Sequence, residues 1–160
     1  MDWLVVVRAL HVLAASAWLG EVVVINVILV PTLSRFQGAA RREFLATVFP
    51  RVFRLASVLS GTVAVTGAFL LYRFTGGDLR VLTDGRWGLC ILIGGGLGAV
   101  LISFHFFMED RLARRVGIGR AGISDDVVED VRVKLKIVPR VGLAVITTIY
   151  VLMLFAVRGV

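Results

Sequence analysis

The stretch LVVVRALHVLAASAWLGEVVVINVILV, from Leu4 to Val30, decides the fold class. It is long enough to cross a bilayer, because a transmembrane helix needs about 20 predominantly apolar residues. Only Arg8, His11 and Glu21 are ionisable within it. Ionisable groups are costly in hydrocarbon and usually serve a purpose there, so these three side chains are candidates for function.

The composition extends this interpretation to the whole chain. Apolar residues make up 58% of the 160 residues, and the mean hydropathy is +0.91, whereas a soluble domain is only about half apolar. Three further stretches have the length and composition of a span, at Val52–Tyr72, Gly88–Phe107 and Val138–Val157. We therefore expect residues 1–160 to form one all-α transmembrane domain. Short connections favour an antiparallel four-helix bundle.

The basic residues predict the orientation of the chain. Of the 18 Lys and Arg residues, 13 flank the connections Pro31–Arg51 and Met108–Lys136, which we expect to be loops. The positive-inside rule then makes these loops cytoplasmic and leaves both termini outside the plasma membrane. The net charge of +7 would face anionic lipid, so it does not indicate nucleic acid. An outer aromatic belt is expected from Trp3, Tyr72, Phe74 and Trp87.

The connection before the fourth span contains a further expected helix. Ser124 can cap it, and Asp125 and Asp126 suit its first turn. Apolar residues then recur at helical spacing, at Val128, Val131 and Leu135. We expect a cytoplasmic amphipathic helix that runs into the fourth span near Pro139. It would either lie on the inner leaflet or dock a partner.

Two histidines share helix faces with small or bulky residues. A helix turns 100° per residue, so His11 and Trp18 share a face. Gly94, Gly98 and His105 share a face of the third span by the same count. Small residues let a flat ligand or a neighbouring helix approach the backbone closely. A purely structural role stays open for both His11 and His105, because either side chain can hydrogen-bond to a neighbouring helix.

The surroundings of His11 are typical of a haem site. Imidazole is a common axial ligand of haem iron, and haem propionates attract arginine near the membrane surface. Arg8, one turn above His11, and Arg86 are the propionate candidates, and Trp18 is expected to pack against the porphyrin. Arg8 could instead extend to the outer surface, and Glu21 could pair with Arg54.

The two histidines are expected at different depths. His11 lies 7 residues after Leu4, and His105 lies 17 residues after Gly88. At 1.5 Å per residue, their levels differ by roughly 15 Å. We therefore consider two haem sites, axial ligands shared across a homodimer, and His/Met ligation with Met153. His11, Cys90 and Met153 together would also suit Cu(I).

Several segments carry a family resemblance. They are RALHVLAASAWLG from Arg8, PTL from Pro31, FPRVFRL from Phe49, GRWGL from Gly85 and IVPRVGLAV from Ile137. These segments resemble the copper-resistance D family and the membrane-bound protoporphyrinogen oxidase family, both small four-span haem proteins. The resemblance implies a b-type haem bundle with His11 as an axial ligand, and the first family implies copper movement. The oxidase family carries a lysine in its third span, whereas this chain has none between Trp87 and Phe107, so the haem-biosynthesis activity is not carried over.

We therefore expect a b-type haem protein of the membrane that acts in electron transfer or small-molecule redox chemistry. One or two haems per chain, a quinone or other redox partner, and a homodimer are part of this expectation. Copper binding or transport and a cofactor-free structural subunit are the alternatives. No Ser/His/Asp set, P-loop or zinc-helix motif is present. Any catalysis would be that of a haem-dependent oxidoreductase, in which the cofactor carries the chemistry.

Overall fold

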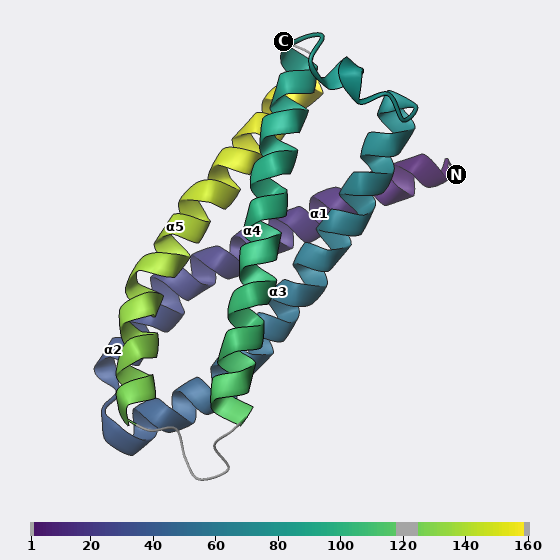
Figure 1. Ribbon diagram of the computed structural model, residues 1–160. Coiled ribbons are helices and arrows are strands. Elements are labelled where there is room, and N and C mark those ends of the chain that lie inside the picture. The colour runs from purple at the N-terminus through teal and green to yellow at the C-terminus, as the bar shows by residue number, and fades with distance from the viewer. Residues whose placement is uncertain (1, 118–124, 159–160) are drawn as a thin grey trace.

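Four long apolar helices make up most of the protein. The computed structural model describes residues 2–117 and 125–158, and every regular element in these ranges is a helix. The long helices are α1 (Trp3–Val24), α3 (Gly38–Thr75), α4 (Arg86–Gly117) and α5 (Asp125–Arg158), shown in Figure 1. Four helical stretches are long and apolar enough to cross a membrane, and the first of them, Trp3–Arg35, comprises α1 and the short helices that follow it. The predicted all-helical fold with four apolar helices is confirmed.

Each long helix contacts two of the others. α1 packs against α3 and α5, and α4 packs against the same two helices. On α1, His11 contacts Thr66 of α3, and Trp18 packs against Ala56 of the same helix, so α1 and α3 run in opposite directions. Figure 1 shows both termini towards one end of the molecule, and α2 (Val30–Arg35) with the start of α3 at the other.

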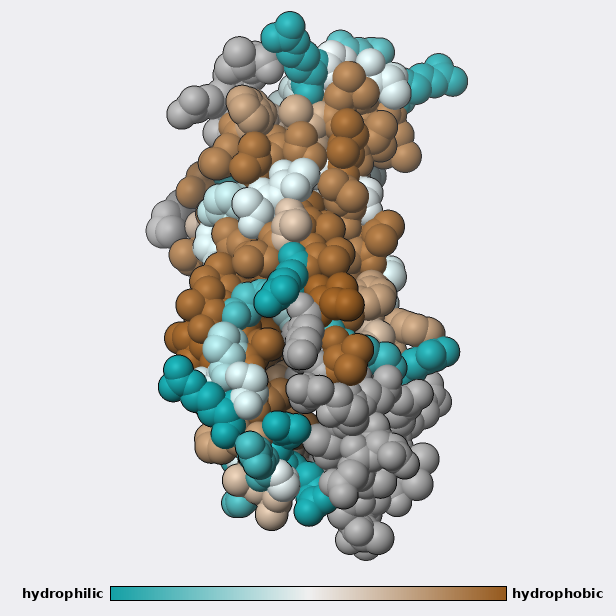
Figure 2. Space-filling view, turned by 90° about the vertical axis from the view of Figure 1, so that its left-hand side faces the viewer, coloured by the Kyte–Doolittle hydropathy of each residue, from teal (hydrophilic) through white to brown (hydrophobic). Residues whose placement is uncertain are grey.

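The outer surface of the helices is apolar. Leu13, Val65 and Val100 are 68%, 72% and 68% exposed, and exposed large apolar side chains occur on all four long helices. Figure 2 shows hydrophobic residues over the middle of the molecule and hydrophilic residues gathered towards its ends. An apolar surface of this extent suits contact with lipid or protein rather than water. The four apolar helices therefore indicate a multi-pass membrane protein.

The first span contains a π-helical turn that the sequence analysis did not anticipate. η1 (Ile25–Leu29) follows α1 directly, and the N–H of Val30 bonds to the carbonyl of Ile25, five residues back. Pro31 lies just beyond it. A proline ring clashes with the carbonyl four residues earlier and leaves that carbonyl without a donor. The wider turn gives the ring room, so the helix continues to Arg35 instead of ending at Val30.

The predicted loop Pro31–Arg51 is wrong in most of its length. Only Phe36 and Gln37 lie outside helices, because α3 begins at Gly38. The segment is rich in charge, but its apolar residues lie on one side, where Leu45 and Phe49 bury against Leu33 of α2. Burial of this apolar face stabilises the helix, whereas its arginines can face water or lipid headgroups.

The connection from α3 to α4 is a tight turn. Gly76 and Gly77 have φ of 62° and 88°, the left-handed backbone that glycine adopts without strain. They end α3, and a single 3-10 turn, η2 (Leu79–Leu82), follows. A Cβ on Gly88 would lie 2.5 Å from the carbonyl oxygen of Leu82, so η2 rests directly on the backbone of α4.

The helix expected before the fourth span runs into that span, as predicted. α5 runs without interruption from Asp125 to Arg158 and includes Pro139. The predicted helix and the span are therefore one helix. Ser124 lies outside the described residues, as do the side chains of Val128, Val131 and Leu135, on which the predicted amphipathic face depends.

Candidate functional site

His11 lies at the interface between α1 and α3. Its Nδ1 is 2.9 Å from the hydroxyl oxygen of Thr66. A Cβ on Gly67 would lie 3.0 Å from the Cε1 of this imidazole, so the ring rests against the glycine backbone. Two adjacent residues of α3 thus orient the histidine, one by a hydrogen bond and one by leaving room.

The hydrogen bonds of Thr66 determine which nitrogen of His11 carries the proton. The Thr66 hydroxyl lies 2.6 Å from the carbonyl oxygen of Thr62, to which it donates its only proton. With that proton on a backbone carbonyl, the same hydroxyl accepts from His11, which favours the proton on Nδ1. The carbonyl of Val63 is a further acceptor beside the imidazole. In this tautomer Nε2 carries a lone pair. A neutral imidazole with Nδ1–H bonded to an oxygen is the usual state of a metal-binding histidine.

Arg8 lies one turn from His11, at the end of the same interface that is nearer the N-terminus. Its guanidinium is 5.2 Å from the centre of the Phe74 ring, within the range of a cation–π contact. Arg73 makes a similar contact with Trp3. Two of the aromatic residues predicted to form a belt, Phe74 and Trp3, therefore each hold an arginine at this end of α1 and α3.

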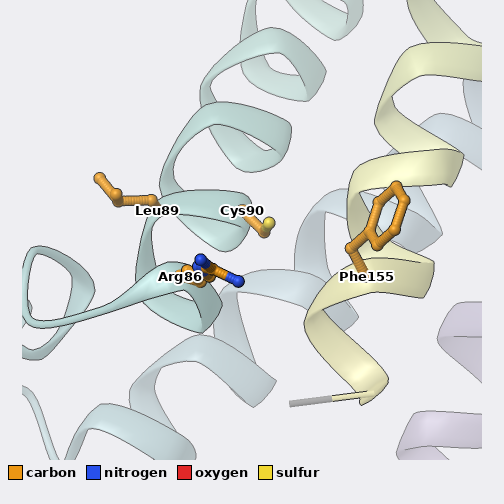
Figure 3. Close-up of a pocket in the computed structure, with 4 residues that line it drawn as sticks. All are labelled: Arg86, Leu89, Cys90 and Phe155. Carbon is orange, nitrogen blue, oxygen red and sulfur yellow. The ribbon is translucent and has the colours of Figure 1, made fainter. Parts of the chain in front are cut away.

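Arg86 belongs to a different helix pair. It lines a groove of about 350 Å³ between α4 and α5 with Leu89, Cys90 and Phe155 (Figure 3). Figure 3 shows the thiol of Cys90 directed towards Phe155 and Leu89 pointing away from it. The volume is at the small end of ligand pockets. The structure thus places the two propionate candidates, Arg8 and Arg86, on separate interfaces.

Met153 and Gly94 contact one another at the α4–α5 interface. A Cβ on Gly94 would lie 2.7 Å from the Cε of Met153, so this glycine serves helix packing. Gly98 has nothing within 4 Å of the same position and is open. His11 contacts α3, whereas Cys90 and Met153 lie where α4 and α5 meet. The structure therefore places the three candidate Cu(I) ligands on two different helix pairs.

Trp18 lies in the core. It is 5% exposed and forms a cluster with Ala56 of α3 and Ile146 of α5. It lies seven residues from His11, about 10 Å along α1. This position makes Trp18 a packing residue at the centre of the molecule.

His105 connects α4 to α3. Its Nε2 is 3.0 Å from the hydroxyl oxygen of Ser57, and its ring centre lies 6.0 Å from that of Phe53. The contact with Ser57 is nine residues from the contact between His11 and Thr66 on the same helix, about 14 Å along its axis. The two histidines of one chain cannot both ligate one iron at this separation.

Several polar contacts were not anticipated from the sequence. The amide of Asn26 donates to the carbonyls of Val22 and Pro139, which ties the π-helical turn to α5. The hydroxyls of Ser16 and Tyr150 are 2.9 Å apart. Hydroxyl residues inside the spans were a visible signal, since such side chains often hydrogen-bond across helices.

Glu21 does not pair with Arg54 as the sequence had suggested. Both of its carboxylate oxygens are buried, and neither has a hydrogen-bond partner among the described residues. Within the same residues, no group of three or more His, Cys, Asp or Glu side chains could hold a metal ion.

Comparison with known proteins adds no relative, because no protein-family model, curated protein or solved structure matches this chain.

Proposed function

We propose that this protein binds b-type haem in the plasma membrane and serves in electron transfer or small-molecule redox chemistry. The supporting observation is the geometry at His11: its Nδ1 lies 2.9 Å from the Thr66 hydroxyl, which itself lies 2.6 Å from the carbonyl oxygen of Thr62, and this arrangement favours a lone pair on Nε2. Haem iron accepts such a nitrogen as an axial ligand. When bound, the haem would supply one-electron chemistry.

The residues around His11 have distinct parts in this proposal. Thr66 holds the tautomer, and Gly67 sets the position of the ring. Arg8 lies one turn nearer the outer end, where it can bind a propionate. The termini would lie outside, because the basic connections are at the opposite end of a four-helix bundle. We further propose a homodimer in which the same histidine, His11, of the second protomer completes the ligation, since His105 of the same chain is too far away.

The absorption spectrum of the purified protein tests this function. Protein purified with haem supplied during expression should be red and show a Soret band. His11→Ala should lose that band, whereas the matched variant His105→Ala should keep it, because His105 is already bonded to Ser57. A colourless protein that takes up no added haem would refute the proposal, as would a His11→Ala variant with unchanged haem content.

Copper binding is the second candidate, and the α4–α5 groove supports it. The Cys90 thiol faces this groove, and Met153 packs on Gly94, one turn away from Cys90 on α4. Thiolate and thioether are the soft ligands that Cu(I) prefers. This candidate predicts stoichiometric copper in a metal assay and its loss in Cys90→Ser and Met153→Ala. Copper retained in both variants would exclude these ligands.

A further inference from the structure

Glu21 is a buried acid that the proposed haem site does not use. It lies 18 residues from Trp3 and 14 from Arg35 in a nearly continuous helical span. These separations correspond to about 27 Å and 21 Å along the helix. Its carboxylate is therefore deep within the apolar part of the molecule, and both oxygens are buried without a hydrogen-bond partner in the described chain.

Among the described residues, no countercharge bonds to this carboxylate. The titratable groups nearest in depth on the helices around it are Arg54 of α3, His105 of α4 and, towards α2 and the start of α3, Arg140 of α5. None of these three bonds to the Glu21 oxygens, and Arg54 and Arg140 are exposed. An unpaired carboxylate in such a place is strongly disfavoured, so a cation must accompany it.

A proton meets this requirement better than a metal ion does. Hard metal ions such as Mg²⁺ or Ca²⁺ need about six oxygen ligands, and in the described residues no second carboxylate joins Glu21. A proton needs only the carboxyl group itself. The missing partners are thus explained if the carboxyl is neutral.

The immediate neighbours of Glu21 differ in the two directions along α1. Towards the termini, the apolar cluster of Trp18, Ala56 and Ile146 comes first, and the hydroxyl pair of Ser16 and Tyr150 lies beyond it. Towards the basic end, η1 follows within one turn, and Asn26 spans from this turn to the carbonyl of Pro139. Polar groups and irregular backbone inside a membrane protein commonly mark the path of an ion or a proton.

We propose that Glu21 is a proton-binding site in the membrane interior and exchanges its proton with the end formed by α2 and the start of α3. This site is independent of haem at His11, because the two residues are ten positions, or about 15 Å, apart on α1.

Dicyclohexylcarbodiimide is the probe, because it forms stable adducts with protonated carboxyl groups in apolar surroundings. The full chain is reconstituted in lipid vesicles and treated with it, and the adduct is mapped by mass spectrometry. We expect Glu21 to be modified, whereas the exposed Glu43 on α3 is the matched control that stays unmodified. In Glu21→Gln the modification of this helix should be lost.

The side of exchange is tested by setting the pH inside and outside the vesicles separately. The orientation of the protein in the vesicles is measured with the variant Asp84→Cys in a Cys90→Ser background. A membrane-impermeant maleimide labels this cysteine only where it faces the outside, since Asp84 is exposed in the connection between α3 and α4. Glu21 modification should fall as the pH rises on the side of α2 and the start of α3. It should not change with the pH on the side of the termini. An unmodified Glu21 at every pH would overturn the proposal. The proposal would also be overturned if Glu21 modification depended on the pH on the side of the termini. The same holds if Na⁺ or K⁺ at constant pH protected Glu21 from modification.

Discussion

Replacing Thr66 with valine separates the ligand role of His11 from its packing. Valine has nearly the shape of threonine but cannot accept the proton of Nδ1, which in the protein donates to the Thr66 hydroxyl over 2.9 Å. The imidazole then either buries an unsatisfied N–H, at a cost of about 1–3 kcal/mol, or moves its proton to Nε2 and loses the ligating lone pair. Loss of such a supporting group typically weakens metal binding 10- to 100-fold. We expect haem affinity to fall by that factor.

The assay is a haem titration of the detergent-solubilised protein followed at the Soret band. Thr62→Val is the matched control, because the Thr62 hydroxyl donates to the carbonyl of Val58 and does not touch His11. It should leave haem affinity within about twofold, since exposed substitutions of this kind cost little. Equal haem affinities for the two variants would refute the reasoning. Independently of haem, ¹⁵N NMR of the labelled imidazoles should show a proton on Nδ1 of His11, and a proton on Nε2 would contradict it.

Three further substitutions test the packing that positions the site. Gly67→Val adds bulk at a position where even a Cβ would lie 3.0 Å from the His11 ring, so haem binding should weaken more than in Gly67→Ala. Equal haem titrations for the two variants would count against this contact. Gly88→Ala places a Cβ 2.5 Å from the backbone of Leu82, so the free energy of unfolding should fall by about 1–3 kcal/mol and the Tm in detergent should be lower. An unchanged Tm would show that η2 moves freely. Asn26→Leu removes the amide that donates to α5, and it should cost about 0.6–1.7 kcal/mol in unfolding by denaturing detergent, whereas wild-type stability would mean that this bond contributes nothing.

The four spans were readable from composition because lipid imposes a simple rule on the chain. Every backbone polar group in a span must bond within the helix, so a run of about 20 apolar residues is enough to identify it. The predicted span Gly88–Phe107 and the apolar helical stretch Arg86–Met108 of the structure differ by only two residues at the start and one at the end. The prediction failed at Pro31–Arg51, where charge was taken to indicate a loop. There Leu45 and Phe49 bury against α2, and this contact between separate helices is not visible in local composition.

The sequence allowed us to predict only those residues of the candidate site that lie on the same helix as His11. His11, Arg8 and Trp18 were singled out by their type and spacing on the first span, but Thr66 and Gly67 were not, because nothing local distinguishes them from other small residues of α3. The same limit explains Gly94: its small size was visible, but only the packed helices show that Met153 fills the space.

The sequence by itself determined that this chain is helical, apolar and able to cross a membrane four times, because each of these properties depends on residues close together along the chain. It also identified which ionisable groups would lie in the spans. Only the tertiary structure decided which of those groups find partners: His11 meets Thr66, His105 meets Ser57, and Glu21 meets none in the described chain. The physical reason is that a buried polar group is stabilised by atoms on neighbouring helices, and their identity depends on how the helices pack rather than on the order of residues in any one of them.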